Sequence, residues 1–293
     1  MSPFQRIALI GFGEVGQILA ADLAEAGVSE IAAYDVAFAR PDSAPSLALG
    51  LHPVRAAASA GEAVLGAQLV VSAVTAAQDV EAARSAAPGM AAGAFFLDLN
   101  SASPGMKQAS AALIDAAGGR YVEAAVMSPI GPRRIASPML LGGVHAAAFA
   151  ALAAPLGFTG AQAFSETIGK ASATKMCRSV MVKGVEALLT ESLLAARCYG
   201  VEAAVLASLA DLMPLPNWPQ LARYMISRSL EHGTRRAEEM REAARTVEEA
   251  AIAPLMSLAI AERQDWAALH RSALAEPDLA AVLDAILLEI KAA

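Results

Sequence analysis

Three glycines near the N-terminus, in the spacing Gly-x-Gly-x-x-Gly, constrain the fold of this chain more than any other feature. The segment follows an apolar run over 6–10 and leads into a helical pattern over 15–26. Gly11 permits the tight turn, Gly13 lets a ligand approach the backbone, and Gly16 allows close helix–strand packing. The helix N-terminus adds unpaired N–H groups that suit phosphate. The loop therefore predicts a dinucleotide site, whose candidate residues are Gly11, Phe12, Gly13, Glu14, Val15 and Gly16.

Asp35 ends the next predicted strand, 30–34, and lies about 20 residues beyond the loop. A carboxylate there can accept hydrogen bonds from the ribose hydroxyls of adenosine and would repel a 2′-phosphate. Arg40, a few residues further on, would favour that phosphate instead. We therefore expect NAD as the preferred cofactor and NADP as the alternative. A turn in an unliganded or differently liganded α/β protein is the other explanation of the glycines.

Apolar runs alternate with helical patterns through the first half of the chain, as is typical of a parallel sheet wrapped by helices. We expect strands over 6–10, 30–34, 68–74, 94–97, 121–126 and 139–141, with a weaker one near Val54, and helices over 15–26, 79–87 and 104–117. After about residue 166 only helical periodicity continues, over 171–199, 201–212, 218–250 and 255–262, with a break at the prolines of 213–217. The sequence predicts a Rossmann-type doubly wound parallel sheet over 1–165 and an all-helical domain over 166–293.

Charge and composition exclude several kinds of partner. The 293 residues carry a formal net charge of −7, which argues against nucleic acid or an anionic membrane as a general partner. The uncharged stretch 135–165 contains too many prolines and glycines for a membrane helix. Cys177 and Cys198 lack metal-ligand spacing, so we expect buried free thiols, no metal site and a cytoplasmic protein.

A charged face runs along the helix predicted over 171–199. Its members are Lys175, Arg178, Ser179 and Glu186, which project from broadly one side. The neighbouring apolar residues predict a buried helix; they are Met181, Val185, Leu188 and Leu189. Charges on a buried helix are costly unless they are paired or line a polar pocket. From these residues alone, a polar active site is as open as a purely structural role, which would be either a buried Lys–Glu pair or a snorkelling surface face.

Four segments together resemble the β-hydroxyacid dehydrogenase family, which includes 3-hydroxyisobutyrate dehydrogenase and 6-phosphogluconate dehydrogenase. They are 11–16, similar to the cofactor loop; 98–104, similar to the segment that approaches the nicotinamide; 123–129 with 141–143, similar to the substrate signature; and 169–179, similar to the catalytic-lysine motif. The resemblance implies that Lys175 exchanges a proton with a substrate hydroxyl while a hydride moves to or from nicotinamide C4.

Candidate contacts follow from these segments. Besides the glycine loop and Asp35, the candidate cofactor-binding residues are Val74, Thr75, Asn100 and Ser101. The candidate substrate-binding residues are Met127, Ser128, Pro129, Arg178, Ser179 and His232. Arg178 could bind a substrate carboxylate through its planar guanidinium. His232 lies on a predicted helix, whose face either meets solvent or reaches an active site.

The chain departs from the family pattern at three places, one of which is a late helical lysine of the family that has no clear equivalent near Arg236 and Ala237. The segment 127–129 reads Met-Ser-Pro where the family has Ser-Gly-Gly, and Ser179 stands where the family has asparagine. We expect an NAD-dependent dehydrogenase of a small hydroxy acid or polyol acid that bears a carboxylate. Oxidative decarboxylation of the 6-phosphogluconate type and a non-catalytic NAD-binding scaffold or sensor are the alternatives. The apolar helix surface between Val180 and Leu212 predicts a homodimer.

Overall fold

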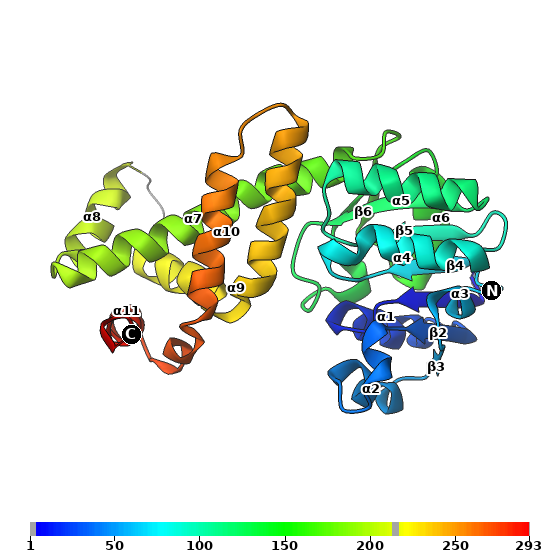
Figure 1. The fold of residues 1–293 in the computed structure, drawn as a ribbon, viewed down its shortest axis with the longest axis horizontal. Coiled ribbons are helices and arrows are strands. Elements are labelled where there is room, and N and C mark those ends of the chain that lie inside the picture. Colours follow the sequence, from blue (N-terminus) through cyan, green and yellow to red (C-terminus); the bar gives the residue numbers. More distant parts are fainter. Residues whose placement is uncertain (1–3, 213–216, 293) are drawn as a thin grey trace. The chain divides into compact units, whose positions relative to one another are not determined.

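The protein, seen here in a computed structural model that describes residues 4–212 and 217–292, forms two units (Figure 1). Contacts divide the chain after Lys175, whereas the sequence analysis placed the boundary at 165. Of the predicted helix break over 213–217, only Asn217 lies within the described residues, where it caps the following helix by accepting a hydrogen bond from the N–H of Gln220.

The N-terminal unit contains eight strands and six complete helices within its described residues. The strands are β1 (Arg6–Ile10), β2 (Glu30–Tyr34), β3 (Arg55–Ala56), β4 (Leu69–Ser72), β5 (Phe95–Asp98), β6 (Arg120–Val126), β7 (Met139–Gly142) and β8 (Ala161–Ser165). The helices are α1 (Glu14–Glu25), α2 (Ala44–Ala48), α3 (Ala60–Ala63), α4 (Asp79–Ala86), α5 (Pro104–Ala116) and α6 (Ala146–Ala153). Helices α2 and α3 and strand β8 were not predicted.

All eight strands form one sheet in the order β3-β2-β1-β4-β5-β6-β7-β8. The strands from β3 to β6 are parallel, as predicted, but β7 runs antiparallel to β6. Strand β8 then pairs parallel with β7 at the sheet edge. Most of its residues are exposed or half-buried, which explains why the sequence shows no apolar run that would predict this strand.

Two apolar cores cover the two faces of the sheet. Alternate residues of β1 illustrate this, since Ile7 and Leu9 face one core and Ala8 and Ile10 face the other. Helices α1 and α6 pack on the first face, while α3, α4 and α5 pack on the second, where Figure 1 shows α4 and α5 in front of the strands. The fold prediction of a helix-wrapped, doubly wound sheet is thus confirmed for this unit.

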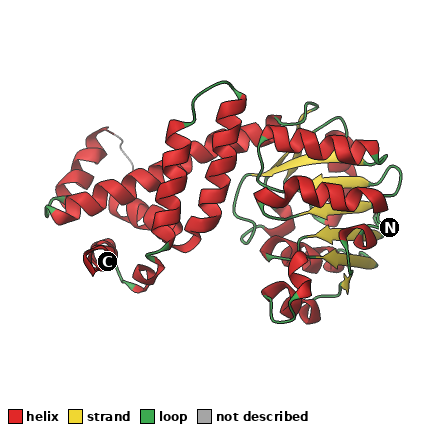
Figure 2. Cartoon of the chain, viewed as in Figure 1, coloured by secondary structure: helices red, strands yellow, loops and turns green. Residues whose placement is uncertain are grey.

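Helices alone make up the described part of the C-terminal unit (Figure 2). They are the continuation of α7 (Lys170–Cys198), α8 (Glu202–Leu212), α9 (Trp218–Glu249), α10 (Leu255–Ala268) and α11 (Leu279–Ala292). Helix α11 was not predicted. In the part of the chain that the structure describes, none of the helices is long and apolar enough to cross a membrane.

Two expectations about α7 are wrong. Cys177 and Cys198 are free thiols but exposed rather than buried. Met181 is 70% exposed and Leu188 is 62% exposed, although the apolar pattern predicted both inside. The helix buries polar residues of its other side instead, among them Glu186, because neighbouring helices of the unit supply partners for them.

Candidate active site

The carboxyl ends of five parallel strands lie along one edge of the sheet. Strands β1, β2, β4, β5 and β6 lead there into the glycine loop, Asp35, Val74, Asn100 and Met127, respectively. In open α/β sheets ligands bind at this edge, because the loops and helix N-termini gather there. The fold therefore brings most of the sequence-predicted residues of the N-terminal unit to one side of the sheet.

The glycine loop leaves no room for side chains at two of its positions. Gly11 has φ +97°, and an added Cβ would collide with the carbonyl oxygen of Ala73. A Cβ at Gly16 would collide with the carbonyl oxygen of Gly11 itself. The Gly11 N–H donates to the Tyr34 carbonyl at 2.8 Å, which ties the loop to β2. These contacts fix the path of the backbone from β1 into α1.

Gly13 differs from the other two glycines because a Cβ there would meet no atom within 4 Å. It is the N-cap of α1, and no side chain caps that helix end. Glu14 is exposed and Val15 half-buried in the first turn. An uncapped helix start beside open space fits a phosphate group, since the N–H groups of the first turn need an acceptor.

Asp35 holds the loop in place through both carboxylate oxygens. Its Oδ2 accepts a hydrogen bond from the Phe12 N–H at 2.7 Å, and Oδ1 accepts one from the Ala37 N–H at 2.8 Å. The side chain of Phe12 is fully buried against the rings of Phe38 and His52. Each carboxylate oxygen keeps a further lone pair, so Asp35 can still accept hydrogen bonds from ribose hydroxyls.

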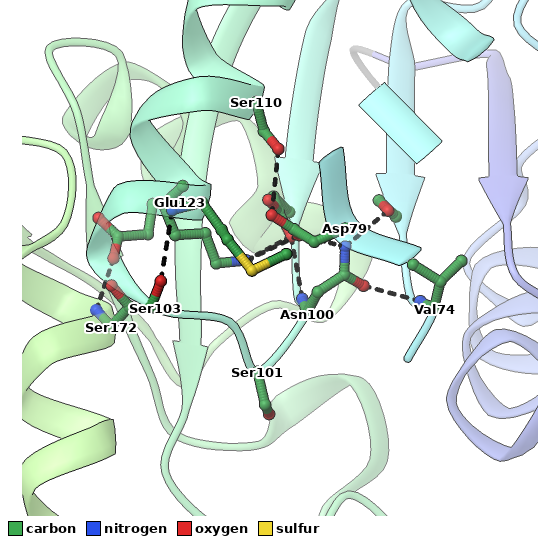
Figure 3. Close-up of polar contacts among 12 residues, drawn as sticks. Val74, Asp79, Asn100, Ser101, Ser103, Ser110, Glu123 and Ser172 are labelled. Carbon is green, nitrogen blue, oxygen red and sulfur yellow. Dashed lines mark hydrogen bonds and ion pairs between the residues drawn. The ribbon is translucent and has the colours of Figure 1, made fainter. Parts of the chain in front are cut away.

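Asn100 and Ser101 point in opposite directions at the end of β5 (Figure 3). Asn100 is 4% exposed, and its amide lies inside the protein, where Oδ1 accepts a hydrogen bond from the Val74 N–H at 2.7 Å. Ser101 points away from these buried contacts. Thr75 is exposed, and its side chain does not cap the short turn that it begins.

A buried polar cluster, which the sequence analysis missed, surrounds the Asn100 amide. Its members are all at most 4% exposed: Ser72, Asp79, Asp98, Asn100, Lys107, Ser110 and Tyr121. The Lys107 ammonium lies 2.5 Å from Asp98 Oδ1 and 3.3 Å from Asp79 Oδ1. The Tyr121 hydroxyl donates to Asp98 Oδ2 at 2.6 Å. Charged groups removed from water in this way persist only when they are paired.

The two aspartates of the buried cluster differ in their ionisation. Burial raises the pKa of Asp98 to about 7, although the Lys107 ammonium opposes that shift. Burial acts in the same direction on Asp79, but there the Lys107 cation and several hydrogen bonds outweigh it and hold the pKa below its ordinary value. Burial alone would lower the pKa of Lys107, but the two carboxylates outweigh burial, so the pKa lies above its ordinary value. Asp98 is thus the group that titrates near neutral pH.

Glu123 anchors the start of α7 from inside the sheet. It is fully buried in the middle of β6. Its Oε2 accepts a hydrogen bond from the Gly169 N–H at 2.7 Å, and Oε1 accepts one from the Ser172 N–H at 2.5 Å. Figure 3 shows Glu123 and Ser172 facing each other. A carboxylate at a helix N-terminus both caps the free N–H groups and complements the helix dipole.

Lys175 lies in the second turn of α7 and reaches the end of β5. Its Nζ donates a hydrogen bond to Ser101 Oγ at 2.6 Å, and the residue is half-buried. Two sequence-predicted residues, 74 positions apart in the chain, are therefore in direct contact. The segment 127–129 follows the carboxyl end of β6, where Met127 donates its N–H to the Pro138 carbonyl and Ser128 is half-buried.

The remaining candidates belong to the C-terminal unit. Arg178 is exposed, whereas Ser179 is buried and its Oγ accepts a hydrogen bond from Lys183 Nζ at 3.0 Å. Lys183 also pairs with Glu239 at 2.7 Å. Glu186 is 1% exposed and forms an ion pair with Arg236. Buried ion pairs thus account for Lys183 and Glu186 on this part of α7, whereas Arg178 is exposed.

His232 marks an irregular point in α9, where its backbone leaves the helical region at φ −123° and ψ 15°. The following Gly233 packs so closely on α10 that a Cβ would collide with the carbonyl oxygen of Gln264, which explains the kink. A cavity of about 290 Å³ lies beside His232 and is lined also by Thr234 and Arg235. Burial and nearby arginines lower the pKa of His232, so the ring is neutral at pH 7.

Comparison with known proteins identifies the family. The family model for the NAD binding domain of 6-phosphogluconate dehydrogenase matches residues 6–169. A conserved hypothetical protein from Sinorhizobium meliloti 1021 is 36% identical, with 95% of each chain covered and a TM-score of 0.74. A conserved protein of unknown function, MTH1747, described as structurally similar to 3-hydroxyacid dehydrogenases, is 30% identical over 90% of this chain and 98% of its own, with a TM-score of 0.66. The chain belongs to the β-hydroxyacid dehydrogenase superfamily.

Two further matches refine this membership. The superfamily fold extends over the whole chain, since Mycobacterium tuberculosis 3-hydroxyisobutyrate dehydrogenase with L-serine aligns over 98% of this chain and 99% of its own, with a TM-score of 0.71 at 18% identity. A family model described as a domain of unknown function matches residues 196–267 of the helical unit. None of the curated proteins matches the sequence. The N-terminal unit is therefore an NAD(P)-binding domain, within a superfamily of dehydrogenase-like proteins.

The sequence contains weak signals for the site residues that the sequence analysis missed. Glu123 interrupts an apolar strand, and a charged residue inside a buried strand needs a partner. Asp98 ends β5 and Asp79 begins α4, both at the ligand-binding edge. Lys107, by contrast, looked like an ordinary charged residue of a surface helix. Only the packing of α5 on α4 and on the sheet reveals it as buried.

Proposed function

We propose that this protein is an NAD(P)-dependent oxidoreductase that acts on the hydroxyl-bearing carbon of a small, carboxylate-bearing substrate, with Lys175 as general acid and base. The contact between Lys175 Nζ and Ser101 Oγ carries the proposal. It joins the only residue predicted to move a proton to the strand end that lies beside the candidate cofactor loops. Membership of a dehydrogenase superfamily supports the reaction type.

The residues of the glycine loop fit a dinucleotide. The uncapped start of α1 and the open space at Gly13 would accommodate the pyrophosphate, and Asp35 would accept hydrogen bonds from the adenosine ribose. When bound, the nicotinamide cofactor supplies the hydride acceptor or donor. Asp35 favours NAD, because its carboxylate would repel a 2′-phosphate.

Lys175 and Ser101 would carry out the proton transfer. A lysine amine held by a serine hydroxyl can take a proton from a substrate hydroxyl in the oxidation direction and return it in the reduction direction. Such proton transfer contributes about 10²–10⁴-fold in rate. Arg178 and the segment Met127-Ser128-Pro129 are the proposed substrate contacts, with Ser179 and His232 as further candidates. Arg178 is exposed, and a guanidinium binds carboxylates through two parallel hydrogen bonds.

Cofactor binding is the first test. Purified protein is titrated with NADH and NADPH while nicotinamide fluorescence is followed, for wild type and Asp35→Ala. We expect tighter binding of NADH, and we expect Asp35→Ala to weaken it. Absence of binding to either cofactor would refute the proposal, while a preference for NADPH would contradict the role of Asp35 alone.

Turnover is the second test, with a panel of small hydroxy acids. Lys175→Ala should lower kcat by about 10²-fold or more and leave the dissociation constant of NADH within about twofold. Lys170→Ala is the matched control, because Lys170 is an exposed lysine at the start of the same helix. Equal rates for the two variants would remove Lys175 from the mechanism. Stoichiometric release of CO₂ would indicate that oxidation is followed by decarboxylation.

A further inference from the structure

One side chain, Asn100, joins the carboxyl ends of β4 and β5 inside the protein. Its Oδ1 accepts a hydrogen bond from the Val74 N–H at 2.7 Å. Its Nδ2 donates to Ser72 Oγ at 2.9 Å and to Asp79 Oδ1 at 2.7 Å, and its backbone N–H donates to Asp98 Oδ1 at 3.0 Å. Asn100 therefore uses both ends of its amide to hold the two strand ends at a set separation (Figure 3).

The two loops held by this amide lead to opposite parts of the candidate site. Val74 lies directly against the cofactor loop, since a Cβ at Gly11 would be 3.1 Å from Val74 Cγ1. Ser101 follows Asn100 in the chain, and its hydroxyl accepts the hydrogen bond from Lys175. Asn100 thus connects the loop that touches the glycine turn with the residue that contacts the proposed proton carrier.

We propose that Asn100 is a positioning residue, which fixes Val74 and Ser101 relative to each other and thereby shapes the part of the site that receives the nicotinamide half of the cofactor. This inference rests on the proposed function. It also changes the expected role of Asn100 from a direct cofactor contact to one that acts through its neighbours, because its amide is already engaged within the protein.

An amide is the group that this position needs. Val74 presents a donor, while Ser72 Oγ and the Asp79 carboxylate act here as acceptors, and asparagine alone among short side chains offers one acceptor and two donors. An aspartate would add a third carboxylate beside Asp79 and Asp98. In a low dielectric the satisfied bonds are strong and an unpaired group is costly, so the cluster holds one arrangement.

Ser110 provides a matched comparison within the same cluster. Its hydroxyl donates to Asp79 Oδ2 at 3.0 Å, and it is fully buried, as Asn100 nearly is. It extends from α5, however, and reaches neither the 73–76 loop nor Ser101. Ser110→Ala and Asn100→Ala each remove one hydrogen bond to Asp79, but only the second releases the Val74 N–H.

The experiment compares binding of NADH and of ADP-ribose, which lacks the nicotinamide ring, to wild type, Asn100→Ala and Ser110→Ala. Calorimetric titration gives both dissociation constants, and thermal unfolding confirms that each variant folds. We expect Asn100→Ala to weaken NADH about tenfold and ADP-ribose by less than about twofold. Ser110→Ala, which removes one hydrogen bond of the cluster where Asn100→Ala removes three, should change both by less than about twofold. Asn100→Ser, a smaller change that keeps a polar group, serves if the alanine variant does not fold.

The outcomes separate this inference from the function on which it rests. Equal weakening of NADH and ADP-ribose in the Asn100 variants, or no weakening of either, would overturn the positioning role. A similar loss of NADH affinity in Ser110→Ala would do so as well, because the effect would then follow the stability of the cluster. Wild-type protein that binds neither ligand would instead refute the proposed function.

Discussion

Glu123→Gln is the substitution whose consequences the structure defines best. The glutamate is fully buried and divides its two oxygens between the N–H groups of Gly169 and Ser172, at 2.7 and 2.5 Å. Glutamine has nearly the same shape but replaces one oxygen with an NH₂ group. Whichever way the amide turns, it brings a donor against one of these two N–H donors.

The expected cost follows from what the substitution removes. A hydrogen bond to a charged group contributes about 1.5–3 kcal/mol, and the charge at a helix N-terminus adds about 0.3–2 kcal/mol. Together they predict a loss of about 2–5 kcal/mol in the free energy of unfolding of the N-terminal unit. For a unit of this size that loss corresponds to a fall in Tm of roughly 4–20 °C.

Glu62→Gln is the control for this measurement. Glu62 also accepts a backbone hydrogen bond near a helix start, from the Ala58 N–H at 2.9 Å, and it pairs with Arg55. Its side chain is 43% exposed, so its loss should cost less than about 1 kcal/mol. Urea unfolding followed by circular dichroism compares the two variants. A loss in Glu123→Gln no larger than that in Glu62→Gln would refute the argument.

Activity should respond as well, because Glu123 holds the first turns of the helix that bears Lys175. A loosened start of α7 would disturb the contact of Lys175 with Ser101 and leave the glycine loop unchanged. We therefore expect Glu123→Gln to lower kcat more than it weakens NADH binding. The reverse ratio would show that Glu123 supports the cofactor loop instead.

Four further predictions follow from the same structure. Gly13→Ala should weaken NADH binding without loss of Tm, whereas Gly16→Ala should lower Tm, since only the second Cβ collides with backbone; equal Tm values would contradict this. Burial raises the pKa of Asp98 from 3.8 to about 7, so the native carboxyl stays protonated where the unfolded one ionises. Wild-type stability in urea should therefore fall, by up to about 4 kcal/mol, as pH rises from about 4 to 7, and Asp98→Asn should flatten that slope. Arg236→Met leaves Glu186 buried without its partner and should cost about 3–5 kcal/mol, against about 0–1 kcal/mol for Arg241→Met, which breaks an exposed pair with Asp265; similar losses would refute the difference. Light scattering at micromolar concentration should give a dimer, because Met181 and Leu188 leave apolar surface exposed on α7, and a monomeric mass would refute this.

The parallel part of the sheet was predictable for a physical reason. Strands β1 and β2 have the predicted bounds because a strand covered on both faces must be apolar along its length. Strand β8 was not predicted, because it lies at an edge of the sheet and carries exposed residues.

The positions of the site residues were easier to predict than the directions of their side chains. Asn100 and Ser101 are neighbours at a strand end, and both were expected to meet the cofactor. Their opposite orientations depend on Asp79 and Ser72, which come from other segments of the chain. A pattern in one segment reports spacing along the chain, whereas the partner that captures a side chain is decided by tertiary packing.

The charged face of α7 shows how two explanations of one pattern can apply to different residues. Helical spacing grouped Lys175 with Ser179 and Glu186, and it left an active site as open as a structural role in a buried ion pair or on a surface face. Glu186 is satisfied by Arg236, which makes the ion pair a structural fact for that turn of the helix. Lys175 instead contacts a neutral serine hydroxyl at a strand end. That strand end belongs to the ligand-binding edge of the sheet, so the contact with Ser101 favours the active-site explanation for Lys175, while the ion pair with Arg236 explains Glu186.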